Sequence, residues 1–221
     1  MRGVPLLLWA VLACDTFAQS AMAEENALLH WAGENWRVEQ EAATPASSIK
    51  QKPDGSLFIQ AHKGMTLWLL HPLAGNYTLT LDRTLLPSAP ACRLSDMNFF
   101  WAAHEPDGTL PRVRDGALAS YNTLVLLYAG IGGNANTTTR FRWYDGSGAR
   151  LLLQESTQPQ DLLQAAHTYH FTLRVNKNTS TILMDGKKVF AHTLPAGPAG
   201  YFGIRTVGSC QTLDHFTLHQ E

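Results

Sequence analysis

The chain has 221 residues, of which 45% are hydrophobic and 16% are charged, and its formal net charge is -1. This length is ample for a substantial hydrophobic core. The near-zero charge excludes the global basic field of nucleic-acid-binding proteins, so selectivity for an anionic ligand would need a local arrangement of arginines.

The first 23 residues have the features of a secretory signal peptide. Arg2 supplies a positive charge, residues 5–13 form a short apolar run, and Ala21-Met22-Ala23 fits a cleavage site. The run is too short for a membrane span. Thr16-Phe17-Ala18 is a second candidate cleavage site, and Val11-Leu12-Ala13-Cys14 is similar to a lipoprotein box, but the features favour soluble export over lipidation at Cys14. We expect a periplasmic or extracellular protein with one domain over residues 24–221.

The rest of the chain is dominated by hydrophobic alternation of period two, which is typical of β-strands. Turn signals such as Asp145-Gly146 and Asp185-Gly186 separate the alternating runs. One short stretch, Gln158–His167, is a candidate for a helix or a turn. The predicted strands are Ser56–Lys63, Asn76–Leu86, Met97–Ala103, Thr139–Tyr144, Thr168–Asn176, Ser180–Gly186, Tyr201–Thr206 and Asp214–Gln220.

Many short strands joined by Asx-Gly turns predict an all-β sandwich or jelly roll. The tail from Tyr169 to Thr206, with "DGKKVF" and "GYFGIRT", and the final strand "LDHFTLH" resemble the closing strands of the concanavalin A-like lectin/glucanase superfamily. This resemblance implies a jelly-roll sandwich of two antiparallel sheets, and it implies no particular activity.

A narrower resemblance covers most of the chain after residue 23. The stretches "RLSDMNFFWAA", "GIGGNANTTTRFRWYDG", "RLLLQE" and "GYFGIRT" resemble the signatures of an exported bacterial family of unknown function within that superfamily. Such proteins are associated with carbohydrate breakdown, so the resemblance implies glycan chemistry without a defined reaction. Cys92 stands where an acidic residue is expected before the arginine, so no acid is assigned at that position.

The alternation assigns side chains to faces, because residues two apart on a strand point the same way. Arg140, Arg142 and Tyr144 share one face, opposite Phe141 and Trp143. In the same way Asp96, Asn98 and Phe100 oppose Met97, Phe99 and Trp101, and Tyr201 and Arg205 oppose Phe202 and Ile204. An ordinary solvated face is the alternative, but such faces favour Lys, Glu, Ser and Thr over Arg, Asn and Tyr. We expect Arg140, Arg142 and Tyr144 to line a sugar-binding groove.

Arginines on a sugar-binding face favour an acidic sugar, because guanidinium pairs with a carboxylate through two hydrogen bonds. The leading hypothesis is therefore a polysaccharide lyase that cleaves a uronic acid-containing glycan by β-elimination. Arg140 or Arg142, helped by Asn98, would neutralise the carboxylate. Tyr144, Tyr128 or His104 would act as base and acid if an arginine lowers a tyrosine pKa. His104 also fits a surface loop histidine.

Two other functions stay open. A glycoside hydrolase needs two carboxylates, and Asp96 and Glu155 are the best pair, although each also fits a structural partner of an arginine. A non-catalytic glycan-binding module would use stacking aromatics such as Tyr201, whereas Trp101 and Trp143 fall on the apolar face. Whether the protein is an enzyme stays open at this point.

The glycine-rich stretch "GIGGNAN" predicts a turn in which Gly130, Gly132 and Gly133 allow positive φ or a close backbone approach. Its spacing is not that of a dinucleotide-binding loop. Asn134 and Asn136 fit two roles equally: hydrogen bonding to sugar hydroxyls, or capping of the turn's own backbone.

Two cysteines, Cys92 and Cys210, lie beyond the signal peptide, and they fit either a disulfide or two buried thiols. The sequence has no serine hydrolase elbow, no zinc motif and no phosphate loop. We expect no cofactor, with structural calcium as an alternative although no loop has a calcium-binding spacing. The expected partner is a polysaccharide or oligosaccharide of anionic character.

Overall fold

The computed structural model describes residues 35–87, 92–194 and 197–221. The predicted signal peptide and its cleavage sites lie outside these residues. Within the described ranges no helix is long and apolar enough to cross a membrane.

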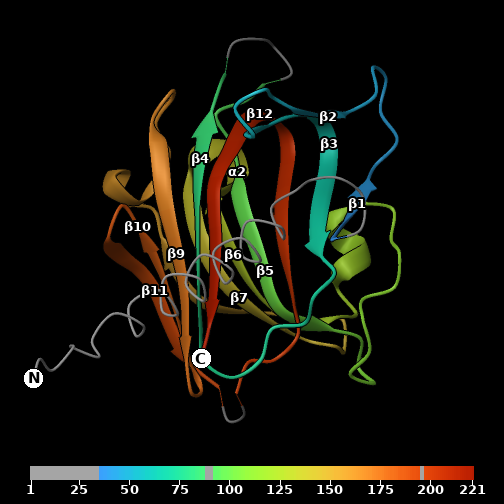
Figure 1. Cartoon of the computed structure of the whole chain (residues 1–221), viewed down its shortest axis with the longest axis vertical. Coiled ribbons are helices and arrows are strands. Elements are labelled where there is room, and N and C mark those ends of the chain that lie inside the picture. The colour runs from blue at the N-terminus through green and yellow to red at the C-terminus, as the bar shows by residue number, and fades with distance from the viewer. Residues whose placement is uncertain (1–34, 88–91, 195–196) are drawn as a thin grey trace, which may run out of the picture.

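The described chain is built almost entirely of antiparallel strands (Figure 1). The strands are β1 Trp36–Gln40, β2 Ser48–Gln51, β3 Leu57–Leu69, β4 Tyr77–Leu85, β5 Met97–His104, β6 Val125–Gly132, β7 Thr138–Asp145, β8 Arg150–Ser156, β9 Thr168–Asn176, β10 Thr179–Met184, β11 Lys187–Thr193 and β12 Tyr201–Gln220. Three short turns complete the set: η1 Leu118–Tyr121, α2 Gly133–Asn136 and η2 Pro159–Asp161.

The strands form two layers that share their two longest members. β12 pairs with β5 through residues 201–205 and with β4 through residues 211–220. β3 pairs with β1 through residues 65–69 and with β2 through residues 57–60. One layer therefore runs β1-β3-β12-β5-β6-β7-β8 and the other runs β2-β3-β12-β4-β9-β10-β11. In Figure 1 the strands β4 and β9 lie in front of β5, β6 and β7.

The long strand β12 changes layer at a bulge. Its register to β3 shifts between Val207 and Ser209, and Gly208 between them has φ +56. A side chain at this glycine would also meet the Arg93 guanidinium 2.9 Å away. Glycine adopts this left-handed backbone without steric cost, so the bulge lets one strand serve both sheets. The sequence predicts two strands here, Tyr201–Thr206 and Asp214–Gln220, and the structure joins them.

The main hydrophobic core fills the space between the layers. Phe99, Trp101, Phe141, Phe202 and Ile204 all belong to it. These are the side chains that the alternation assigns to the apolar face, and Trp143 packs against the same core. The predicted face assignment of β5, β7 and β12 agrees with this packing.

Two local expectations compare with the structure as follows. The stretch Gln158–His167 holds only the three-residue 3-10 turn η2, so the turn alternative is correct: Pro159 opens it and the chain is extended again at Leu162. Gly130 lies inside strand β6, not in the turn. The turn itself is α2, and Asn134, Ala135 and Asn136 have positive φ there.

Cys92 and Cys210 form a disulfide, although 118 positions separate them in the sequence. Cys210 lies in β12, and Cys92 lies just before β5. The bond therefore ties the entry to β5 to the strand shared by both layers.

Candidate functional site

A row of polar positions crosses the outer face of the β1–β8 layer. Directly paired residues in antiparallel strands share a face, and the pairings run through every strand of this layer. We call this set the polar row: Glu39, Thr66, Arg205, Asn98, Gly130, Arg140 and Glu155. It brings together four of the predicted site residues, Arg205, Asn98, Arg140 and Glu155, from segments far apart in the chain.

A second row of mainly aromatic positions runs beside the polar row. Phe100 pairs with Tyr128, and Tyr128 pairs with Arg142, which in turn faces Leu152. The rings pack on one another, with centroids 5.5 Å apart for Phe100 and Tyr128 and 6.0 Å apart for Tyr128 and Tyr144. This second cluster lies on the opposite side of the sheet from the main core.

Residues 105–124, which we call the covering segment, lie over the β1, β3 and β12 part of this face. Tyr121 donates a hydrogen bond of 2.7 Å from its hydroxyl to Oε2 of Glu39. Arg205 donates one of 2.6 Å from Nη1 to the Gly116 carbonyl, and its guanidinium lies 5.4 Å from the Tyr121 ring centre. In Figure 1 the yellow-green turn of this segment lies beside β3. Arg205 therefore holds the covering segment and is not presented to a ligand, contrary to its expected sugar-binding role.

The β7 and β8 part of the face is open. The side chains of Arg140 and Glu155 are 30% and 34% exposed, and they form an ion pair. Arg142 donates a hydrogen bond from Nη1 to the Arg150 carbonyl, at 3.4 Å. Among the described residues no carboxylate lies within 4.0 Å of the Arg142 or Arg150 guanidinium, whereas Arg140 has one. Arg150, which the sequence analysis did not single out, pairs with Tyr144 and so lies on the same face.

Tyr128 and Gly130 mark the boundary between the covered and open parts. A Cβ atom at Gly130 would lie 2.4 Å from the Tyr128 hydroxyl oxygen. Gly130 is therefore needed because the Tyr128 side chain lies over its backbone. The expected close approach at this glycine is present, and the neighbour is another part of the same strand.

The tyrosines do not fit the role of a base. Burial raises the pKa of Tyr128, and the nearby carboxylate of Asp96 raises it further. Burial also raises the pKa of Tyr144, and the guanidinium groups of Arg150 and Arg142 reverse only part of that shift. The sequence-based condition that an arginine lowers a tyrosine pKa is not met, because desolvation outweighs the arginine charges.

Asp96 is held by structural hydrogen bonds. It accepts one of 2.6 Å from Nδ2 of Asn98 and one of 2.8 Å from the Val207 amide. Its charge also opposes the effect of burial on Arg83, which lowers the pKa of that guanidinium to about 9. Arg83 therefore stays charged at neutral pH inside the core, where it donates to Oε1 of Gln211 at 2.8 Å. The sequence analysis did not single out Arg83, although an arginine in phase with Leu79 and Leu81 was a signal for a buried charge.

The two carboxylates proposed for hydrolysis are far apart. Glu155 lies on β8, where it pairs with Arg140 of β7. Asp96 lies just before β5 and contacts Asn98 of that strand, which is three strands away from β8. Three strand spacings of about 4.8 Å separate the two backbones by about 14 Å. Paired glycosidase carboxyl groups lie only about 5 to 9.5 Å apart. The arrangement does not match a hydrolase pair.

Four other expected site residues have local structural contacts or lie at the far end of β5. Asn136 exchanges two 2.8 Å hydrogen bonds with the Leu163 backbone, and Asn134 donates to Oγ1 of Thr138 at 3.3 Å. Both asparagines therefore take the turn-stabilising role. His104 is at the far end of β5, where its Nδ1 lies 2.6 Å from the Glu105 carbonyl, and Tyr201 pairs with Ala103 at the same end.

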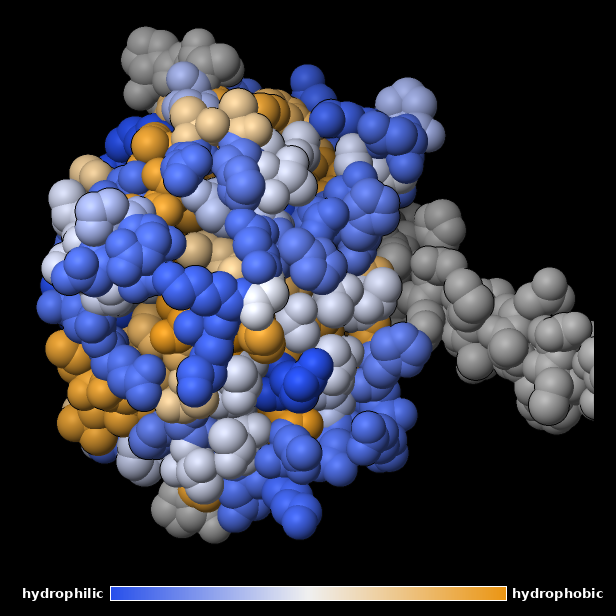
Figure 2. Space-filling model, turned by 90° about the vertical axis from the view of Figure 1, so that its left-hand side faces the viewer, coloured by the Kyte–Doolittle hydropathy of each residue, from blue (hydrophilic) through white to orange (hydrophobic). Residues whose placement is uncertain are grey.

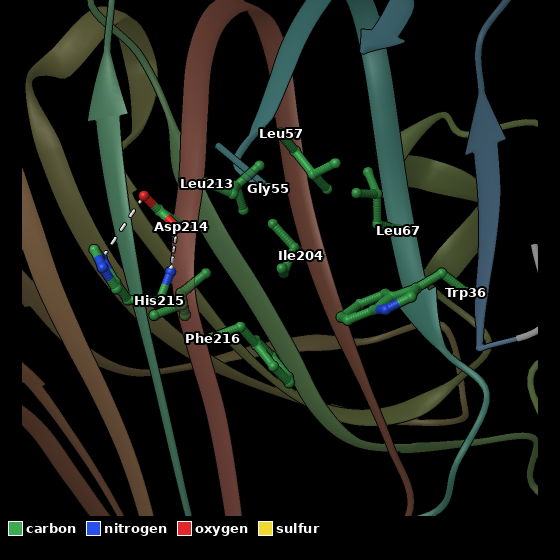
Figure 3. A pocket seen from close by; sticks show the side chains of 10 residues that line it. Trp36, Gly55, Leu57, Leu67, Ile204, Leu213, Asp214, His215 and Phe216 are labelled. Atoms are coloured by element: carbon green, nitrogen blue, oxygen red, sulfur yellow. Dashed lines mark hydrogen bonds and ion pairs between the residues drawn. The ribbon is translucent and has the colours of Figure 1, made fainter. Parts of the chain in front are cut away.

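Cavities elsewhere have a different character. An apolar cavity of about 80 Å³ opens between β3, β4 and β12, with Trp36, Leu67 and Phe216 in its wall and Asp214 and His215 at its rim (Figure 3). A wider depression of about 720 Å³ lies on the β9–β10 hairpin, with Arg174 and Lys177 in its lining. Figure 2 shows the side of the molecule toward β10 and β11, where hydrophilic residues predominate between separate apolar patches. Neither cavity gathers arginines with aromatic rings as the open face does.

Comparison with known proteins places the chain in a family. The profile of the family described as "Domain of unknown function (DUF6250)" matches residues 59–216. The chain belongs to the DUF6250 family. The DUF6250 match spans β3 to β12 and includes every member of the polar row except Glu39. No curated protein matches the chain.

Solved structures similar to this DUF6250 chain share its fold. A protein of unknown function with a galectin-like fold from Bacillus subtilis has a TM-score of 0.64 and 18% identity, over 84% of this chain and 89% of that one. The carbohydrate-binding module CBM66 from Bacillus subtilis has a TM-score of 0.57 and 11% identity, over 86% and 98%. The VIP36 exoplasmic/lumenal domain, in a Ca²⁺/Man3GlcNAc-bound form, has a TM-score of 0.57 and 13% identity, over 85% and 84%. The predicted all-β jelly-roll sandwich is confirmed.

The described part of the DUF6250 chain offers no obvious metal site. No group of three or more His, Cys, Asp or Glu side chains within it is arranged to hold a metal ion.

Proposed function

We propose that this protein binds a glycan of anionic character on the open part of the β1–β8 layer, over β6, β7 and β8. The observation that carries the proposal is the pair Arg142 and Arg150. Both lie on the open face, and neither has a carboxylate partner among the described residues. Guanidinium groups without a protein counter-charge are suited to a carboxylate or sulfate on a ligand.

Neighbouring groups support a sugar as the carrier of that charge. Glu155 and Arg140 supply an acceptor and donors for hydroxyl groups, and their mutual ion pair fixes their positions. Several fold neighbours are carbohydrate-binding proteins by name, among them CBM66 and the VIP36 domain. That likeness is one of fold, so it supports glycan binding as a class and no particular sugar.

Binding is better supported than β-elimination. Burial raises the pKa of both Tyr128 and Tyr144, so each hydroxyl keeps its proton at neutral pH. His104 pairs with Val125, which shares a face with Leu127 of the main core, so its side chain lies on the opposite side of the sheet from the arginines. The lyase hypothesis from the sequence therefore lacks a base beside the arginines.

Export to an oxidising compartment belongs to the same proposal. It is supported by the signal-peptide features of residues 1–23 and by the Cys92–Cys210 disulfide. In such a compartment the protein would meet extracellular or periplasmic polysaccharides.

The test is titration calorimetry of the purified protein against neutral polysaccharides and uronic acid polymers, with galacturonate, alginate and glucuronate-containing chains in the panel. Binding to at least one acidic polymer and none to the neutral ones is expected. Absorbance near 235 nm and new reducing ends are followed in the same samples. A rise in absorbance would restore elimination, and no binding to any polymer would contradict the proposal.

A further inference from the structure

Exposure changes abruptly along the polar row. Thr66, Arg205 and Asn98 are at most 1% exposed, and Glu39 is 2% exposed. Beyond Gly130, the Arg140 and Glu155 side chains are 30% and 34% exposed. A ligand lying along the row would therefore be blocked by protein between β6 and β5, whereas the end of the row at β8 is exposed to solvent.

The closed end is a fixed wall. The covering segment is fastened by Tyr121 and Arg205, as described above, and also by Arg37, which donates to the Pro111 carbonyl. Within the segment, Arg114 forms an ion pair of 2.7 Å with Glu105 and donates to the Ser120 carbonyl at 2.8 Å. Opening the wall would break the hydrogen bonds that Tyr121, Arg205 and Arg37 make across it and would expose the buried Tyr121 ring to water.

The other end of the row is the edge of the sheet. β8 is the last strand of its layer, and Leu151 and Leu152 on it are 45% and 51% exposed. Along the strand direction, which is perpendicular to the row, the exposed part of this face on β7 ends at Tyr144, because that side chain is fully buried. The accessible strip is thus closed at β5 and at Tyr144 and is open over β8.

We propose that the polar row receives the end of a glycan chain and not an internal stretch. This inference rests on the proposed function of the same site. The terminal sugar would lie over Gly130 and Arg140 against Tyr128, with its charged group toward Arg142 and Arg150. The rest of the chain would leave over β8 into solvent, because an internal stretch would need room on both sides of the terminal position.

The experiment uses ladders of uronic acid oligosaccharides, from dimers to polymers, titrated into the full chain. Each ladder is prepared in three forms: native, reduced at the reducing end, and with an unsaturated sugar at the non-reducing end. We expect one protein bound per chain at every length, affinity that changes less than about threefold beyond the shortest binding oligomer, and loss of at least tenfold for one of the two end modifications.

Other outcomes distinguish recognition of a chain end from glycan binding in general. If the number of bound proteins rises with chain length and neither end modification matters, end recognition is wrong while glycan binding stands. If no oligomer or polymer of any ladder binds, both are wrong. Arg142→Ala should weaken whichever mode is seen, whereas Arg174→Ala, on the far sheet, serves as the control that leaves it unchanged.

Discussion

Arg140 and Arg142 occupy the same face of one strand, yet they differ in the charge beside them. Arg140 is paired with Glu155, whereas no carboxylate of the described residues pairs with Arg142. A ligand anion therefore competes with a protein carboxylate at Arg140 and with none at Arg142.

Arg142→Ala is expected to reduce glycan affinity about tenfold or more, since a charge-assisted hydrogen bond contributes about 1.5 kcal/mol or more. Arg140→Ala should have a smaller effect, because that guanidinium is already neutralised by Glu155. Calorimetry measures the affinities and thermal melting verifies the fold, with Arg174→Ala as the matched control. Equal binding by the Arg142 variant and the wild type would remove this residue from the site.

Asp96 gives a second prediction, on stability. Asp96→Ala removes the acceptor of the Asn98 and Val207 hydrogen bonds and the charge that opposes the burial of Arg83. We expect the free energy of unfolding to fall by about 3 kcal/mol or more, as measured by urea denaturation. A variant as stable as the wild type would show that Asp96 has no structural role.

The covering segment is the element that decides how much of the face is accessible. Its ion pair between Glu105 and Arg114 is partly buried. Burial acts to raise the pKa of Glu105, but the hydrogen bonds from Arg114 and from the Arg112 amide, with the charges of both arginines, lower it below the ordinary 4.5.

The sign of this pKa shift predicts an acid response of the segment. A carboxyl group with a lowered folded-state pKa stabilises the fold above its unfolded-state pKa, here about 4.5, and this contribution is lost as pH falls through the lower folded value. We expect amide protection within residues 105–124, relative to the intrinsic exchange rate at each pH, to fall below about pH 4.5. In Glu105→Gln this step should be absent and protection should already be weaker at pH 7. An unchanged acid step in the variant would assign it to another carboxylate.

At the scale of the whole molecule, the disulfide and the two shared strands hold the layers together. Cys92 and Cys210 are 118 positions apart, so the bond closes a long loop in the unfolded chain. Replacing both cysteines by alanine should lower the free energy of unfolding by about 4 to 5 kcal/mol through the loop-closure entropy. Glycan affinity at low temperature should be retained, because the open face lies on β6 to β8. Chemical denaturation with and without reductant checks the first point, and a stability equal to that of the wild type would contradict it.

Much of the architecture follows from local pattern. The period-two alternation places Phe141 and Arg142 on opposite faces because neighbouring residues of any strand point opposite ways. The same logic is correct for Trp101 and Asn98 and for Ile204 and Arg205. Strands without clear alternation, such as β1, β2 and β11, were not predicted, because their pairing depends on β3 and β10 and not on their own sequences.

The sequence by itself determined the all-β class, the two-sided strands and the gathering of arginine, asparagine and tyrosine on one face, since all three depend on side-chain alternation along a strand. Only the tertiary structure decided which of those side chains a ligand can reach. Arg205 and Tyr144 are buried by residues distant in sequence, Glu155 neutralises Arg140 from the next strand, and Asp96 supports a buried Arg83 in the other layer. Such contacts are non-local, so neither the exposure nor the charge balance of the face can be read from any one segment.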